Sequence, residues 1–210
     1  MTLRVSSASG EVVLTLPQRA KLATARAFLE AQAGWIAARM ARVPARTHLI
    51  AGAVLPLRGQ PHQIVHDPTR RGSTRAILGP TGEVVIVVSG DAAAVPGRVR
   101  RFLLGEAKDD LTAAVSRYAN RLGVVPNRIT LRDTTSRWGS CSATGALSFS
   151  WRLIMAPEMV LDYLAAHEVA HLKELNHSRR FWSILHNLCP ATDEAERWLK
   201  RHGTELHRFG

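Results

Sequence analysis

The sequence has little cysteine and no long apolar segment. Its two cysteines, Cys141 and Cys189, are far apart and form no C-x-x-C pair, which excludes a dithiol redox motif or a zinc-thiolate motif. We expect both to be buried free thiols. The longest apolar runs, Ala53–Leu57 and Val84–Val88, fall far short of the ~20 residues that span a bilayer, so no membrane segment is expected.

The sequence also lacks a secretory signal, internal repeats and low-complexity tracts. Its first residues alternate like a strand and contain no apolar signal-peptide region, so we expect a cytoplasmic protein. No period of the kind found in solenoids is present. With 46% hydrophobic and 21% charged residues in a chain of 210, the protein can bury a core, which excludes disorder as its main state.

Acidic residues are scarce relative to basic ones. There are 17 Asp and Glu against 28 Lys and Arg, a formal net charge of +11, and the pI is about 11.1. Such a balance raises the question of a nucleic-acid or acidic-membrane partner. The basic residues are spread along the chain without a block of like charges or a recognition motif, so direct nucleic-acid binding is not favoured and stands as the alternative.

Periodic patterns divide the first half of the chain into short elements. Alternating apolar residues predict a β-hairpin that stops at Pro17, and three- and four-residue spacing predicts a helix from Gln18 to Arg42. Three short β-type runs then predict a small sheet: Ala53–Leu57, Gln63–His66 and Glu83–Val88. We expect this N-terminal β-rich region to occupy residues 1–92.

The second half, residues 93–210, is predicted to form a separate domain. It begins with a long helical pattern from Val99 that ends at Gly123. Two strands are expected at Arg128–Arg132 and Ala146–Ser150, with Trp138–Ser142 between them as a third strand or glycine-kinked edge. The remaining residues are predicted to be helical, so the fold class is α+β.

The stretch from Ala156 to His177 carries the chemistry. Pro157 suits the first position of a helix, and the apolar period that follows places His167 and His171 one turn apart. Their imidazoles lie on one face about 6 Å apart, close enough to share one metal ion. Glu168 projects from the same side and can reach a metal-bound water. This is an H-E-x-x-H motif on a helix, typical of zinc metallopeptidases.

A catalytic zinc site usually takes three protein ligands, so a third is needed. His177 follows His171 by six residues, the interval of the metzincin motif. A continuing helix would carry His177 away from the metal face, so the chain must turn, and Asn176 is the residue expected to adopt a left-handed conformation there. Alternatively, His177 caps the next helix and the third ligand is a downstream carboxylate: Asp193, Glu194 or Glu196.

Together these motifs resemble the YgjP-like family of zinc metallopeptidases, which is similar to the SprT-like and minigluzincin groups. The resemblance is dense from Asn127 to Leu199 and rests on Arg137–Ser142, Trp151–Ile154, Pro157, Tyr163, His167–Leu172, Asn176–Ser178 and Phe181–Trp182. It implies a zincin-like catalytic domain with a small sheet packed on the active-site helix. It also implies one Zn²⁺ per chain on His167, His171 and His177, with Glu168 as the base.

The expected activity is hydrolysis of peptide bonds in a peptide or protein substrate. Zinc lowers the pKa of its bound water toward ~7, and Glu168 takes the proton and can return it to the leaving amine. The donor that would stabilise the oxyanion is left open among three residues: Tyr163, Arg152 and His186. Trp138–Ser142 is either a strand edge that pairs with an extended peptide or a core strand.

Overall fold

Contacts divide the protein into two compact units. The computed structural model describes residues 1–6, 10–41, 43, 45–79 and 82–210. Met1–Ala45 forms one unit and Arg46–Gly210 the other. The boundary expected between residues 92 and 93 therefore lies inside the second unit. The physical reason is a shared core, because Ile86 and Val88 are buried in the same apolar cluster as Val99 of the following helix.

The first unit is a hairpin followed by two helices: β1 (Thr2–Val5), β2 (Val12–Thr15), α1 (Leu22–Ala31) and α2 (Ala33–Met40). β1 and β2 pair in antiparallel fashion, so the predicted hairpin is confirmed. The predicted single helix is interrupted at Gln32, whose φ of −98° and ψ of 6° are not helical. Arg42, the expected end of that helix, lies outside the described residues.

The second unit opens with a four-stranded mixed sheet: β3 (Val54–Leu57), β4 (Gln60–Asp67), β5 (Arg75–Leu78) and β6 (Val84–Ser89). The strand order is β3-β4-β6-β5, and β4 and β6 are parallel. β5 has no counterpart among the strands predicted from sequence, because its short Arg-Ala-Ile-Leu segment alternates too little to stand out. Its strand structure comes from pairing with β6.

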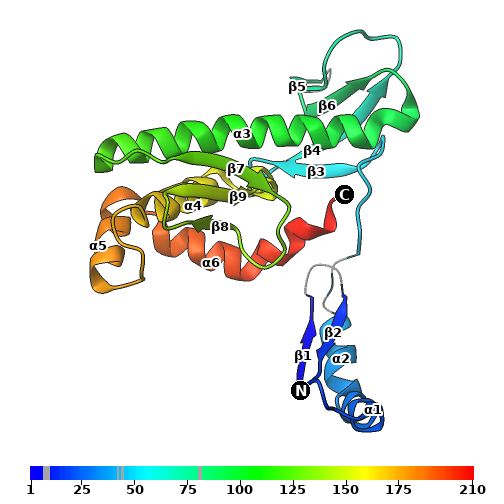
Figure 1. Cartoon of the computed structure of the whole chain (residues 1–210). Helices are drawn as coiled ribbons and strands as arrows, with labels where there is room; N and C mark the ends of the chain where they lie inside the picture. Colours follow the sequence, from blue (N-terminus) through cyan, green and yellow to red (C-terminus); the bar gives the residue numbers. More distant parts are fainter. Residues whose placement is uncertain (7–9, 42, 44, 80–81) are drawn as a thin grey trace. The chain divides into compact units, whose positions relative to one another are not determined.

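A long helix, α3 (Val95–Leu122), joins this sheet to the rest of the unit (Figure 1). Its residues Val99, Leu103 and Leu111 are fully buried and contribute to the core. The helix ends as predicted at Gly123, which has a φ of +66° and caps the helix in the left-handed conformation that glycine adopts without strain.

A second sheet follows α3 and contains three strands: β7 (Arg128–Arg132), β8 (Gly139–Cys141) and β9 (Ala146–Ser150). The predicted strands are confirmed here. The order is β7-β9-β8, with β7 parallel and β8 antiparallel to the central β9. β7 and β8 are therefore the two edges of this sheet (Figure 1).

The C-terminal part is helical, as predicted: η2 (Trp151–Met155), α4 (Glu158–Ala170), α5 (Arg179–Leu188), α6 (Thr192–His202) and η3 (Gly203–Arg208). α4 contacts α3, α5, α6 and β8, so it lies at the centre of the unit. Its mostly apolar sequence, buried on nearly every side, is typical of a core helix. The α+β class is confirmed. Within the described ranges, no helix combines the length and apolar character that crossing a membrane requires.

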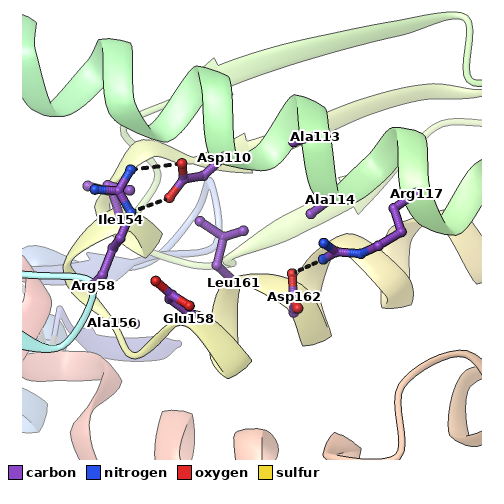
Figure 2. Close-up of a pocket in the computed structure, with 10 residues that line it drawn as sticks. All are labelled: Arg58, Asp110, Ala113, Ala114, Arg117, Ile154, Ala156, Glu158, Leu161 and Asp162. Atoms are coloured by element: carbon purple, nitrogen blue, oxygen red, sulfur yellow. Dashed lines mark hydrogen bonds and ion pairs between the residues drawn. The ribbon is translucent and has the colours of Figure 1, made fainter.

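An arginine in the turn between β3 and β4 ties that turn to α3 (Figure 2). Arg58 donates to both carboxylate oxygens of Asp110, at 2.7 and 2.8 Å, and to Glu106 at 2.8 Å. The hydrogen bond to Asp110 is the main reason that the pKa of Arg58 rises above its usual value. Arg58 also has a φ of +50°, which is uncommon outside glycine. The bidentate pair thus holds a strained turn on the helix.

Beside this pair is a cavity of about 250 Å³ between α3 and α4. Figure 2 shows that a second ion pair, between Arg117 and Asp162, also lies along the cavity. The metal-motif histidines are not among the residues that line it. Since Arg58 is paired with Asp110 of α3 and Arg117 of α3 is paired with Asp162 of α4, we interpret this cavity as a structural joint.

We predict that Asp110→Ala lowers the free energy of unfolding by about 1–2 kcal/mol, because a bidentate charged hydrogen bond to Arg58 is lost. The matched control is Asp109→Ala, a neighbouring exposed carboxylate for which no ion pair is found among the described residues. It should change stability by less than about 0.5 kcal/mol. Chemical denaturation measures both. Equal losses of unfolding free energy in the two variants would show that the Arg58–Asp110 pair does not stabilise the fold.

Candidate metal centre

α4 places the first two histidines of the H-E-x-x-H motif on one face. His167 lies in the last turn of the helix, and His171 follows as its C-terminal cap. The Nε2 atoms of the two imidazoles are 3.2 Å apart. The one-turn spacing predicted from the sequence therefore brings both ring nitrogens to one point.

The chain turns after α4 and returns His177 to the same point. The turn is held by backbone hydrogen bonds from Leu172 to Val169 and from Lys173 to Ala170, each 3.0 Å long. The Nε2 atom of His177 lies 3.2 Å from that of His167. The expected turn between His171 and His177 is confirmed.

Two details of this turn differ from expectation. Asn176 does not adopt the left-handed conformation, since Arg58 is the non-glycine residue with positive φ in the part of the chain that the structure describes. Successive tight turns reverse the chain without it. The cap of α5 is Ser178, whose hydroxyl accepts a 3.3 Å hydrogen bond from the backbone N–H of Phe181, so His177 is not needed for capping.

The donor set fits a four-coordinate divalent metal. Ligands at ~2.0–2.1 Å from a tetrahedral zinc are about 3.3 Å from one another, close to the two 3.2 Å separations found here. Burial lowers the pKa of His167 to about 3, so this imidazole is neutral and its lone pair is available. His171 Nδ1 donates to the carbonyl of Glu174 at 3.0 Å, which leaves Nε2 as the ligand atom.

A buried aromatic ring packs against the three imidazoles. Phe181 is fully buried, and the centre of its ring lies 5.0 Å from that of His167, 4.4 Å from that of His171 and 4.7 Å from that of His177. The ring of His171 stacks on it. The helical spacing of Phe181 predicts a core residue behind the site, but it does not predict contact with all three imidazoles. Packing on one rigid ring limits the rotamers of all three histidines.

Glu168 is the buried acidic residue of the site. Only 3% of its surface is exposed, and its Oε2 atom has no hydrogen-bond partner among the described residues. Burial raises the pKa of Glu168 to about 8, and the positive charge of Arg137 opposes this rise. A carboxyl group that is buried but unpaired is suited to exchange protons near neutral pH.

Gly139, at the start of β8, makes room for the Glu168 side chain. A Cβ atom built on Gly139 would lie 2.9 Å from both Cγ and Cδ of Glu168, closer than real Cβ contacts allow. Only glycine therefore permits this approach of strand and carboxylate. The sequence of Trp138–Ser142 indicated a strand or a glycine-kinked edge. It contains no signal that identifies Glu168 as the side chain next to the glycine.

The downstream carboxylates considered as alternative ligands lie outside the histidine cluster. Among the described residues, the group whose donor atoms could share a metal consists of His167, His171 and His177. Asp193 instead accepts from His186 at 3.2 Å, and Glu196 accepts from Lys200 at 2.9 Å. Glu194 is exposed on the first turn of α6 and is not part of the cluster either.

Of the three candidate oxyanion donors, one lies next to the cluster. The ring of Tyr163 is 5.7 Å from that of His167, and burial raises the pKa of its hydroxyl, which stays protonated. Arg152 donates to Asp133 at 2.7 Å and to the carbonyl of Phe209 at 2.6 Å, so it anchors the C-terminal segment. His186 is paired with Asp193, as described above.

Comparison with known proteins adds a family assignment. The model of the YgjP-like family, described as a metallopeptidase domain, matches residues 1–202. A solved structure, the metallopeptidase zymogen of Pyrococcus abyssi abylysin, is 22% identical, with 47% of this chain and 97% of that chain covered and a TM-score of 0.40. An overlap this limited carries no argument about the site. No curated protein matches the chain.

We predict that Gly139→Ala destabilises the protein by about 1–3 kcal/mol, because the new methyl group overlaps the Glu168 side chain. In a Glu168→Ala background the same substitution should cost less than about 0.5 kcal/mol, since the obstacle is gone. Gly105→Ala, on an open helix surface, is the control and should be neutral or stabilising. Denaturant titrations of the wild type and the four variants give the free energies of unfolding. If Gly139→Ala costs the same with and without the Glu168 side chain, the predicted overlap is refuted.

Proposed function

The chain belongs to the YgjP-like metallopeptidase family, and we propose that it is a zinc-dependent hydrolase of peptide bonds whose base is Glu168. One observation carries the proposal: the Nε2 atoms of two imidazoles each lie 3.2 Å from that of His167, beside a buried, unpaired carboxyl group. Neither feature alone indicates hydrolysis. Together they supply a metal site and a proton carrier within one helix and the turn after it.

His167, His171 and His177 are the proposed zinc ligands, one ion per chain. Three neutral imidazoles leave the ion its full charge and one coordination position open. When bound, zinc supplies a Lewis acid that polarises a carbonyl and lowers the pKa of water toward ~7. The protein contributes the orientation, through the Phe181 ring and the hydrogen bond from His171 to Glu174.

Glu168 is proposed to move the proton. It lies one residue from a ligand, and its Oε2 atom has no hydrogen-bond partner in the described structure, so it is available to accept a proton from the attacking water. Without a metal ion, burial raises its pKa to about 8, which favours the protonated form that can donate to the leaving amine. The charge of a bound zinc ion would lower this pKa and favour the ionised form that accepts the proton from water. The absence of a side chain at Gly139 leaves the space that the Glu168 carboxyl group occupies.

Tyr163 is the proposed donor to the developing oxyanion. It precedes His167 by one turn on α4, and its ring lies near that histidine. The raised pKa keeps its hydroxyl protonated and therefore able to donate.

A substrate peptide is proposed to pair with the free edge of β8. Trp138 accepts a hydrogen bond from Ser150, and Ser142 donates one to Ala146, both toward β9. Since bonding alternates along an antiparallel strand, the backbone groups of Gly139 and Cys141 face the open edge. An extended peptide bound there would run past Glu168, which touches Gly139.

A cytoplasmic location is proposed with this function. Both cysteines are free thiols, Cys189 buried and Cys141 half-buried, as a reducing compartment would allow.

We predict that Glu168→Gln lowers kcat on an unstructured substrate such as casein by about 10²–10⁴-fold while zinc remains bound. The amide cannot accept the proton, yet it fits the same space. Glu174→Gln, a nearby change in carboxylate charge, should retain activity, because that residue acts through its backbone carbonyl. Full activity in Glu168→Gln would rule out the proposed mechanism.

We also predict that untagged protein contains one zinc per chain. His177→Ala should weaken zinc affinity by more than the ~10–100-fold that is lost when a residue hydrogen-bonded to a metal ligand is replaced. Elemental mass spectrometry and competition with a chelator measure this. Glu196→Ala should keep its zinc. If zinc survives in His177→Ala but is lost in Glu196→Ala, the third ligand is the carboxylate.

A further inference from the structure

A groove of about 490 Å³ runs between α3 and β7, on the side of the second sheet away from β8. It is lined by residues of these two elements: Arg101, Leu104, Gly105, Lys108, Thr112, Ile129, Thr130 and Leu131. The last three are consecutive in β7. Because consecutive side chains of a strand point to opposite faces, a cavity that touches three in a row lies along the strand's edge.

That edge has backbone groups available for pairing. In the described sheet β7 is bonded to β9 and to no other strand, so one row of its N–H and C=O groups faces the groove. Such an edge accepts an added strand when an extended peptide supplies the complementary row.

The rim of the groove is positively charged. Arg101 and Lys108 lie two helical turns apart on α3, and Arg128 and Arg132 flank the groove-lining residues of β7. All four are exposed, and no ion pair is found for them within the described residues. None of the described residues that line the groove is acidic. The rim therefore favours a partner that carries carboxylates.

The floor of the groove is apolar. Leu104, Ile129 and Leu131 are partly buried and pack against the core. A smaller cavity of about 190 Å³ continues the basic face along α3, where Arg98 and Arg101 lie beside Phe102. The groove thus combines an apolar floor with a basic rim, which suits a peptide that carries both apolar and acidic side chains.

We propose that this groove binds an extended acidic peptide as an additional strand on β7, with alternate apolar side chains on the floor and carboxylates at the rim. The free strand edge favours a peptide over a nucleic acid, because it offers a row of peptide-pairing groups that a phosphate backbone does not match. The surface is distinct from the metal centre. It would serve as a docking site for a segment of a substrate or partner protein.

The test is fluorescence anisotropy with a labelled, capped peptide of alternating glutamate and valine, on full-length Glu168→Gln protein so that cleavage cannot consume the probe. The double variant Arg101→Glu/Lys108→Glu should bind at least about tenfold more weakly, because two attractive contacts become repulsive. The matched control, Arg197→Glu/Arg201→Glu, makes the same charge change on exposed residues of α6 and should bind as before.

Two further probes separate strand addition from attraction by charge. A peptide of the same sequence with N-methyl groups on alternate residues keeps its carboxylates but loses backbone donors, and it should not bind. Equal binding of the methylated peptide, or equal weakening by the α6 control, would overturn the proposal. Tighter binding of single-stranded oligothymidine than of the peptide, lost in Arg101→Glu/Lys108→Glu, would overturn it in favour of nucleic acid.

Discussion

The enclosure of α4 is the constraint on which the site depends. This helix is surrounded by α3, α5, α6 and β8, so the polar side chains at its C-terminal end are removed from water. Burying imidazoles without partners is costly, and that cost is offset when the imidazoles bind a cation. Two 3.2 Å separations bring the Nε2 atoms of His171 and His177 next to that of His167, the spacing that the proposed metal site requires. The buried ring of Phe181 packs against all three imidazoles.

The second sheet connects this centre to two different surfaces. On one edge, β8 lies so close to α4 that a side chain at position 139 would overlap Glu168, and glycine avoids this overlap. On the other edge, β7 borders a basic groove with α3. The central strand β9 holds both edges in register.

The sequence determined much of this before any tertiary contact was known. The H-E-x-x-H spacing, the apolar period around it and Pro157 predict a helix that presents His167 and His171 together, because i and i+4 positions share a face of any α-helix. The strands β7 and β9 and the end of α3 at Gly123 were also predictable from local signals. Their signals are local periodicity and a glycine that adopts positive φ.

The tertiary structure decided what lies next to these elements. β5 is a strand because it pairs with β6, and residues 46–92 join the second unit because Ile86 and Val88 share a core with α3. His177 reaches His167 through a turn that uses no left-handed Asn176. Gly139 lies close to Glu168, and Phe181 packs against the histidines. The periodicity of the sequence within each segment does not predict these contacts between segments. Local pattern encodes which face a residue occupies, whereas packing between distant segments decides what that face meets.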